Sequence, residues 1–177
     1  MIVYEFPLNE RVRILLRLEH MADRLGELVL REHPLDHHFA LQTLFEIVDL
    51  CDSRSDLKSE ILKELERYRQ TVLSFRAIEG LEKRVNKLLG EIDQCYSDLN
   101  QQLGRLSHEF NHNEWLTSVR SRLNIPAGTC SFDHPSYHAW QQQPAAQRQQ
   151  DLGQWLAPLT PLVSSIRLLM RLLRETA

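Results

Sequence analysis

The stretch LEKRVNKLLGEIDQCYSDLNQQL, residues 81–103, carries the pattern that decides the fold. Its apolar residues recur at steps of three and four, at Leu81, Val85, Leu88, Ile92, Cys95, Leu99 and Leu103. This spacing places them on one face of a helix with 3.6 residues per turn. The sequence therefore predicts a long amphipathic helix over this stretch.

The residues before this helix repeat the pattern. Apolar side chains recur at Leu57, Ile61, Leu65, Tyr68, Val72 and Phe75, and a turn is expected around Glu79-Gly80. Two long amphipathic helices joined by a short turn form an antiparallel hairpin with coiled-coil-like packing. A long antiparallel helical hairpin is thus the main element that the sequence predicts.

Further helices are expected on both sides of the hairpin. One runs from about residue 9 to 32 with Asn9 as N-cap, and His33-Pro34 ends it because proline disfavours the α conformation in the preceding residue. Asp36 is expected to cap the next helix, which reaches about Cys51. Others are expected at 112–123, from about Leu152 to a break at Pro158 and Pro161, and beyond that break.

Two stretches do not show a helical pattern. MIVYEFP, residues 1–7, has β-branched and aromatic residues and predicts a short edge strand or an extended arm. Residues 125–136 contain Pro126, Gly128 and Pro135, which favour a structured loop or a short strand. The expected fold class is mainly α, a helical bundle with the long hairpin, plus a small β or loop part.

Composition excludes several classes of protein. With 42% hydrophobic and 25% charged residues, the 177-residue chain has the values of a soluble globular protein. No run of about 18 apolar residues predicts a membrane span, and no signal peptide is evident, so a cytoplasmic location is expected. Acidic residues outnumber basic ones by 24 to 21, which argues against a nucleic-acid-binding bundle. The three cysteines are expected to be free thiols.

A metal site is the alternative that the residues leave open. Cys130, His134 and His138 fall four apart, and thiolate with imidazole is a common ligand set for zinc. Pro135 interrupts the spacing, however, and no second cysteine lies nearby to complete four ligands. Glycine-rich phosphate loops and the usual hydrolase and metalloprotease motifs are absent, so no catalytic residue is predicted.

Arginine positions give a weak indication of an anion site. Arg54 precedes the third helix and Lys58 follows one turn later. Backbone amides at a helix N-terminus, the helix dipole and a guanidinium together favour a carboxylate.

Three stretches in order resemble one family. EFPLNERVRILLRLEH, FEIVDLCDSRSDLKSEILKELER and LNIPAGTCSFDHPSYHAW are similar to the bacterial cell-division family ZapD, whose members associate with the FtsZ ring. The resemblance runs from about residue 4 to the end of the chain. It implies a cytoplasmic, homodimeric, non-enzymatic protein at the midcell division ring, without cofactor, membrane or nucleic acid. Its expected activity is to bind the C-terminal tail of FtsZ and to bundle FtsZ filaments.

The resemblance also implies an organisation and a set of site residues. Residues 1–8 would be the N-terminal strand or arm, 9–124 the helical domain, and 125–177 a loop and helices leading into a β-rich domain that is C-terminally shortened here. In the loop, Cys130 and Phe132 would pack inward. The tail-binding arginine that maps onto this chain is Arg54, and Lys58 joins it by proximity. Charge alone adds Arg167, Arg171 and Arg174.

Overall fold

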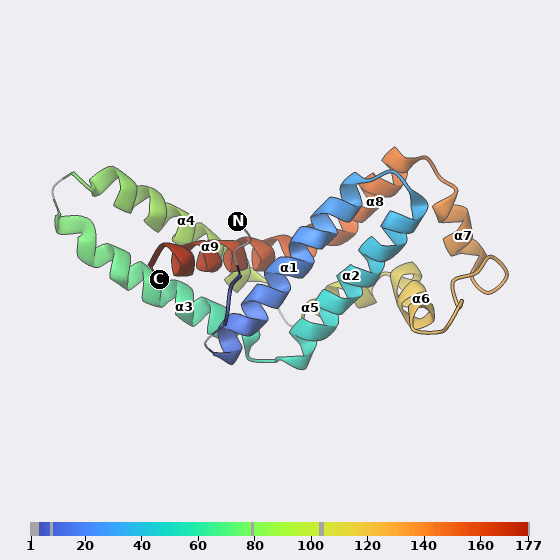
Figure 1. Ribbon diagram of the computed structural model, residues 1–177, viewed down its shortest axis with the longest axis horizontal. Helices are drawn as coiled ribbons and strands as arrows, with labels where there is room; N and C mark the ends of the chain where they lie inside the picture. The colour runs from blue at the N-terminus through green and yellow to red at the C-terminus, as the bar shows by residue number, and fades with distance from the viewer. Residues whose placement is uncertain (1–3, 8, 79, 103–104, 177) are drawn as a thin grey trace. The chain divides into compact units, whose positions relative to one another are not determined.

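The computed structural model describes residues 4–7, 9–78, 80–102 and 105–176, and within them the chain is helical (Figure 1). The long elements are α1 (Glu10–Leu30), α2 (Pro34–Ser53), α3 (Leu57–Ser74), α4 (Glu82–Gln101), α8 (Ala145–Leu156) and α9 (Thr160–Thr176). The shorter ones are α5 (Leu106–Asn111), α6 (Glu114–Leu123) and α7 (Pro135–Gln141), with the 3₁₀ turns η1 (Phe75–Ala77) and η2 (Ala157–Leu159). The prediction of a mainly α protein is confirmed.

The chain divides into two compact units, each built from separate stretches of sequence. Unit 1 comprises Met1–His20, Asp56–Leu103 and Thr160–Ala177. Unit 2 comprises Met21–Ser55 and Gly104–Leu159. The domain boundaries predicted at residues 8 and 124 divide the chain into consecutive segments, whereas each compact unit combines separate stretches. These boundaries stay a prediction.

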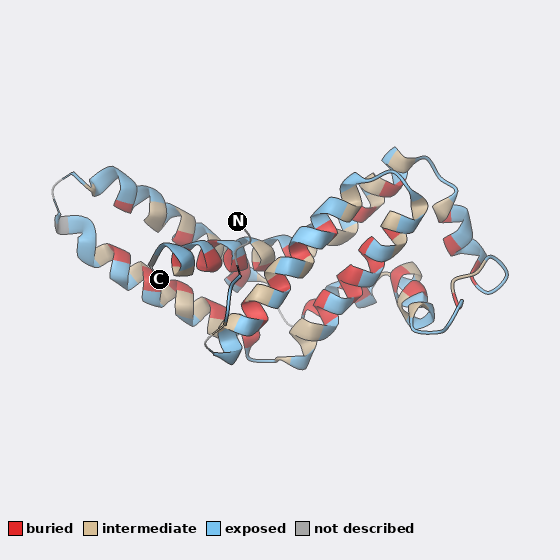
Figure 2. Ribbon diagram, in the orientation of Figure 1, coloured by how far each residue is buried: buried red, intermediate tan, exposed pale blue. Residues whose placement is uncertain are grey.

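Unit 1 contains the predicted hairpin, in which α3 and α4 pack along each other, and α9 packs against both (Figure 1). Leu65 on α3 and Ile92 and Leu99 on α4 are 1% exposed or less (Figure 2). Gly80 lies at φ +87° in the turn, a left-handed conformation that favours glycine. Helix α4 ends at Gln101. Leu103, the last residue of the predicted stripe, lies outside the described residues.

Helix α9 begins where a break was predicted. Pro161 occupies its first turn, where no backbone N–H is needed for an intrahelical bond. The chain passes from α8 through the 3₁₀ turn η2 into α9. The two prolines therefore interrupt the α-helix only over η2, and helical structure continues after it. Helix α9 buries Leu162, Ile166, Leu168, Leu169, Met170 and Leu172.

The run from Ala145 to Glu175 is long and apolar enough to span a membrane by length and composition alone. This is a weak indication, because a core helix of a soluble protein passes the same test. Within the protein, 44% of the apolar window is buried. Packing within the protein therefore covers somewhat less than half of this apolar window.

Unit 2 is organised around α2. Its Ala40, Leu41, Leu44 and Val48 are fully buried, in agreement with the apolar circumference that the sequence shows. Aromatic side chains gather beside them: Trp115 stacks on Trp155 with ring centroids 4.9 Å apart, and further ring contacts link Tyr137 and Trp140. Offset aromatic pairs of this kind stabilise beyond the area they bury.

A buried guanidinium ties the connections of unit 2 together. Arg148 of α8 is 4% exposed, and its Nε donates to His37 Nδ1 at 2.9 Å. Its terminal nitrogens donate to the backbone carbonyls of Gln141, Gln143 and Glu32. Because Nδ1 of His37 accepts a hydrogen bond, Nε2 carries the proton and donates to the Arg31 carbonyl at 2.7 Å. Each polar group in this cluster thus has a partner.

The predicted β part is wrong. Residues 4–7 have no regular secondary structure, while residues 1–3 and 8 lie outside the described part of the chain. The 125–136 loop is made of turns and bends, with Ala127 at φ +57°, and α7 begins at its Pro135. β-propensity describes fit to a sheet, so MIVYEFP cannot form a strand without a neighbour to pair with.

Three local predictions are also corrected. His33, rather than Asp36, is the N-cap of α2, because its Nδ1 accepts the N–H of Leu35 at 3.2 Å. Helix α8 begins at Ala145, inside the glutamine-rich stretch that lacks an apolar stripe. Phe132 is 82% exposed instead of packed inward, and Cys130 is half-buried.

Unit 2 is expected to lose stability as pH falls from about 7 toward 5. Burial lowers the pKa of His37 below 6.5, with the Arg148 charge adding to this and the Arg31 carbonyl and Asp36 opposing it. Burial also lowers the pKa of His38. The unfolded chain then binds more protons, so stability is full above about pH 6.5 and declines below it.

Urea unfolding monitored by tryptophan fluorescence tests this, because Trp115, Trp140 and Trp155 all lie in unit 2. His37→Gln cannot take up a proton and should flatten the pH dependence, leaving only the part due to His38. An unchanged slope in this variant would show that His37 does not titrate on unfolding.

Candidate functional site

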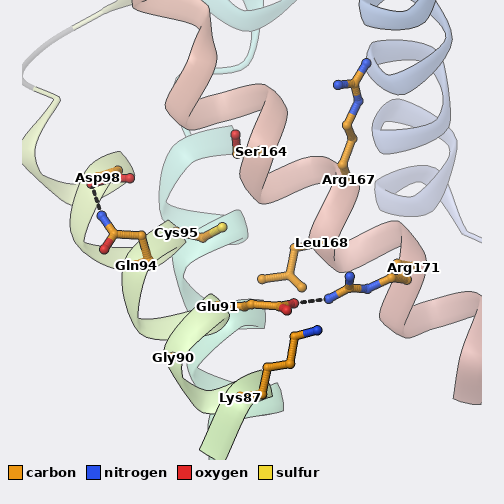
Figure 3. A pocket seen from close by; sticks show the side chains of 10 residues that line it. All are labelled: Lys87, Gly90, Glu91, Gln94, Cys95, Asp98, Ser164, Arg167, Leu168 and Arg171. Atoms are coloured by element: carbon orange, nitrogen blue, oxygen red, sulfur yellow. Dashed lines mark hydrogen bonds and ion pairs between the residues drawn. The ribbon is translucent and has the colours of Figure 1, made fainter.

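A groove of about 780 Å³ runs between α4 and α9 in unit 1 (Figure 3). Lys87, Glu91 and Asp98 project from α4, and Arg167 and Arg171 project from α9. Leu168, which is 6% exposed, and the half-buried Cys95 contribute apolar surface to its floor. The groove therefore combines an apolar floor with charged edges.

The charges along the groove are unevenly compensated. Arg171 forms an ion pair with Glu91, and this hydrogen bond raises the pKa of the guanidinium. Asp98 accepts a hydrogen bond from the Gln94 amide at 2.7 Å. Lys87 has no hydrogen bond or ion pair with any residue that the structure describes. Two of the predicted arginines, Arg167 and Arg171, are thus brought together with a lysine that sequence reasoning missed.

Arg174 does not line the groove and forms ion pairs with two carboxylates. Its guanidinium donates to Glu5 at 2.6 and 2.9 Å and to Glu19 at 2.9 and 2.6 Å. The hydrogen bond from Arg174 lowers the pKa of Glu5, and the two carboxylates raise the pKa of Arg174. Arg174 thereby joins the N-terminal segment to α1 and α9.

Arg54 lies in the connection between α2 and α3. Its backbone N–H donates to the Cys51 carbonyl at 3.2 Å, which closes the last turn of α2. The side chain is half-buried. A cation at this place is favoured by the negative end of the α2 dipole. Arg54 belongs to unit 2, whereas Lys58 belongs to unit 1.

The Lys58 ammonium is engaged within unit 1. It stands in the first turn of α3 and donates to the backbone carbonyls of Asn100, at 3.3 Å, and of Gln102. These carbonyls lie at and just beyond the end of α4, where no intrahelical donor is available. Lys58 therefore fixes the start of α3 to the end of α4.

The cysteine and histidines at 130–138 do not form a metal site. His134 is 6% exposed, and its Nδ1 accepts the N–H of Tyr137 at 3.2 Å as the N-cap of α7. Its Nε2 lies 3.0 Å from Ser118 Oγ, so both ring nitrogens are occupied. His138 is exposed. Nowhere in residues 4–7, 9–78, 80–102 and 105–176 do three potential ligands gather.

Neither Cys51 nor Cys95 is an activated nucleophile. Burial raises the pKa of Cys51 to about 12, and burial also raises the pKa of Cys95. A nucleophilic cysteine needs the opposite shift, because the thiolate is the reactive form. Cys130 donates to Asp133 Oδ2 at 3.5 Å.

Comparison with known proteins decides the family. The profile described as "ZapD: Cell division protein" matches residues 16–177. A curated relative, "Cell division protein ZapD" of Cupriavidus pinatubonensis (strain JMP 134 / LMG 1197), is 48% identical over 177 residues, covering 99% of this chain and 70% of the relative. The chain belongs to the ZapD family. As a ZapD-family member it is a cell-division factor.

Several structural residues of this ZapD-family chain escaped sequence reasoning. Lys87 sits one turn before Glu91, an ordinary pair of opposite charges on a helix, so nothing in the sequence singles it out. The contact of His37 with Arg148 joins residues 111 apart, which no local pattern reveals. His134 offered a local signal, because it directly precedes Pro135 and proline favours the first position of a helix.

His134→Ala should lower the free energy of unfolding by about 0.5–2 kcal/mol, the usual cost of losing an N-cap. His134→Asn restores a capping acceptor and should recover part of this loss. His138→Ala changes an exposed side chain and should be close to neutral. Chemical denaturation of the three variants measures the differences.

The same proteins test the metal alternative. Equimolar zinc should leave the melting temperature of the unaltered chain unchanged, because the His134 ring already has partners on both nitrogens. A zinc-dependent rise in melting temperature that disappears in His134→Ala would restore the metal hypothesis.

Proposed function

We propose that the chain is a non-enzymatic factor that binds the C-terminal tail of FtsZ and cross-links FtsZ filaments in the cytoplasm at midcell. The observation that carries the proposal is the match to the cell-division family over residues 16–177, together with 48% identity to a curated member.

Cross-linking requires two tail sites in one particle. A homodimer with one site in each copy can hold tails from neighbouring filaments. Once one tail is bound, the second binding event becomes intramolecular, and its effective concentration can reach the millimolar range. Weak individual sites therefore suffice to bundle filaments that carry many tails, and bundling promotes assembly of the division ring.

Arg54 is the proposed anchor for a tail carboxylate. Its planar guanidinium can donate two parallel hydrogen bonds to a carboxylate, which a lysine cannot do. Lys58 remains a predicted contributor, although its ammonium already donates to the carbonyls of Asn100 and Gln102 within unit 1. Arg167, Arg171 and Arg174 remain predicted contributors, with Arg171 and Arg174 already paired with carboxylates.

Arg54→Glu should reduce co-sedimentation with FtsZ polymers at least about tenfold. A charge-assisted hydrogen bond contributes about 1.5–3 kcal/mol, and the reversal adds repulsion from the tail carboxylates. Arg76→Glu is the matched control, because Arg76 is exposed on η1 at the far end of α3 and undergoes the same change of charge. Equal pelleting of the two variants would remove Arg54 from the tail site.

Bundling should weaken as salt is raised from about 0.05 M to about 0.3 M, because screening reduces attraction between exposed charges. Light scattering of polymerising FtsZ with this chain added measures the effect, and excess tail peptide should abolish the scattering increase. The control is FtsZ without its tail. Scattering that the chain still raises in this control would contradict binding through the tail.

A further inference from the structure

The α3–α4 hairpin ends in an exposed tip, residues 75–87, which comprises η1, the turn at Gly80 and the start of α4 (Figure 1). Val72, at 8% exposure, is the last buried residue of α3. Within the described part of the tip only Val85 is buried, at 6% exposure (Figure 2). The hydrophobic core of the hairpin therefore ends near these two valines, and the tip projects beyond it.

The tip presents apolar side chains to solvent. Phe75 and Ile78, in η1 and directly after it, are 45% and 46% exposed. Leu81, on the other side of the turn, is half-buried. Single exposed apolar residues are ordinary on a protein surface, but a cluster rimmed by charges marks an interaction site. The end of the hairpin is therefore a candidate docking surface.

The same tip is basic, although the whole chain has a net charge of −3. Its acidic residues are Glu79 and Glu82, and its basic residues are Arg76, Lys83, Arg84 and Lys87. All four basic residues are exposed, and none forms a hydrogen bond or ion pair with a residue that the structure describes. Elsewhere in unit 1, by contrast, Arg11, Arg69 and Arg174 pair with carboxylates. The charges of the tip are thus available to an anion outside the chain.

The basic side chains of α4 flank the apolar end of the hairpin. Lys83 and Lys87 each lie two residues from the buried Val85, which corresponds to about 200° around a helix. Both lysines therefore lie on the side of α4 opposite the hairpin core, one helical turn apart. Apolar side chains at the end and cations along the side are the arrangement of segments that bind the surface of a membrane.

We propose that the hairpin tip docks reversibly on an anionic lipid surface. Phe75 and Ile78 enter the boundary between headgroups and acyl chains, and the basic residues lie against the headgroups. Burial of apolar side chains and attraction to anionic lipid add together in such contacts. The contact is peripheral, and it departs from the expectation, implied by the family resemblance, that no membrane is involved.

The shape of the tip favours a lipid surface over an acidic peptide. Peptides and small ligands bind in grooves and clefts that enclose much of their surface. The tip is instead the convex end of two helices, closed by Gly80 at φ +87°. A convex end can enter a lipid interface directly, because lipids rearrange around it, whereas it encloses little of a peptide.

Vesicle co-sedimentation at physiological salt tests the proposal. The unaltered chain should pellet with vesicles made of equal parts phosphatidylglycerol and phosphatidylcholine, and it should stay in solution with phosphatidylcholine alone. Lys83→Glu combined with Arg84→Glu should lower the partition coefficient about tenfold or more, because each basic residue near an anionic surface strengthens binding roughly fivefold. Phe75→Ser combined with Ile78→Ser should also lower it about tenfold, at unchanged net charge.

Lys63→Glu combined with Arg17→Glu is the matched control. Both residues are exposed in unit 1 outside the tip, and the change of charge is the same. The control should partition like the unaltered chain, because screening confines the attraction to charges within about 8 Å of the lipid. Circular dichroism confirms that each variant is folded.

Three outcomes would overturn the proposal. The first is an unaltered chain that does not pellet with the anionic vesicles, and the second is an equal loss in the control and in the tip variants. The third is a chain that ignores vesicles but binds a glutamate-rich peptide through Lys83 and Arg84. In that case the tip docks on an acidic protein.

A tryptophan placed in the tip reports insertion directly. The native Trp115, Trp140 and Trp155 all lie in unit 2. Phe75→Trp should therefore show a blue shift of its fluorescence when anionic vesicles are added, because the new indole leaves water, whereas the unaltered chain should show none. A Phe75→Trp spectrum that the vesicles leave unchanged would contradict entry of the tip into the lipid interface.

Bundling of FtsZ without vesicles keeps this inference separate from the proposed function. Lys83→Glu combined with Arg84→Glu should raise the light scattering of polymerising FtsZ as the unaltered chain does, while losing vesicle binding. An unaltered chain that binds vesicles without bundling FtsZ contradicts only the proposed function. One that bundles FtsZ but does not bind vesicles contradicts only the role of the tip.

Discussion

The α3–α4 hairpin has a hydrophobic core because α9 packs over the apolar side chains of both helices. Two packed helices shield only one side of their apolar stripes, and isolated two-element units are marginal in water. Leu169 and Ile166 of α9 are 1% and 2% exposed because they lie against the hairpin helices. Each buried aliphatic side chain of this size contributes about 1.5–3 kcal/mol, whereas an exposed ion pair such as Arg171 with Glu91 contributes about 0–1 kcal/mol. Apolar contact therefore holds the three helices together, and the surface charges remain available for recognition.

In unit 2 a buried cation, rather than an apolar helix, holds the connecting segments in place. The Arg148 guanidinium has no carboxylate partner in its cluster and is surrounded instead by backbone carbonyls and the neutral ring of His37. An unpaired buried charge would be costly, but a guanidinium has five N–H donors in a fixed plane that several carbonyls can satisfy together. The carbonyls that Arg148 reaches belong to the end of α7, the connection after it and the connection before α2. One side chain thus fixes loops that would otherwise have only weak mutual contact.

Much of the fold could be predicted from local spacing, and little of the candidate site could. The stripe from Val85 to Leu99 identifies α4 because burial imposes the helical period on sequence. The first part of α8, residues 145–151, has no such stripe, and only the structure reveals it. The strand expected at MIVYEFP depended on a pairing partner, which local residues cannot specify. Of the five cations predicted for the site, Arg167 and Arg171 do share one groove, but Lys58 and Arg174 bind groups of their own unit that no short-range pattern indicates.

The division of unit 1 into three stretches has a consequence for biosynthesis. Its hairpin leaves the ribosome well before Thr160–Thr176, with 56 residues, 104 to 159, still to be translated. At roughly 5–20 residues per second, this interval lasts about 3–11 s. Throughout it the hairpin lacks the cover of α9, so the apolar side chains that α9 later packs against stay exposed to solvent. Completion of unit 1 is therefore timed by translation of α9 rather than by the microsecond speed at which helices themselves form.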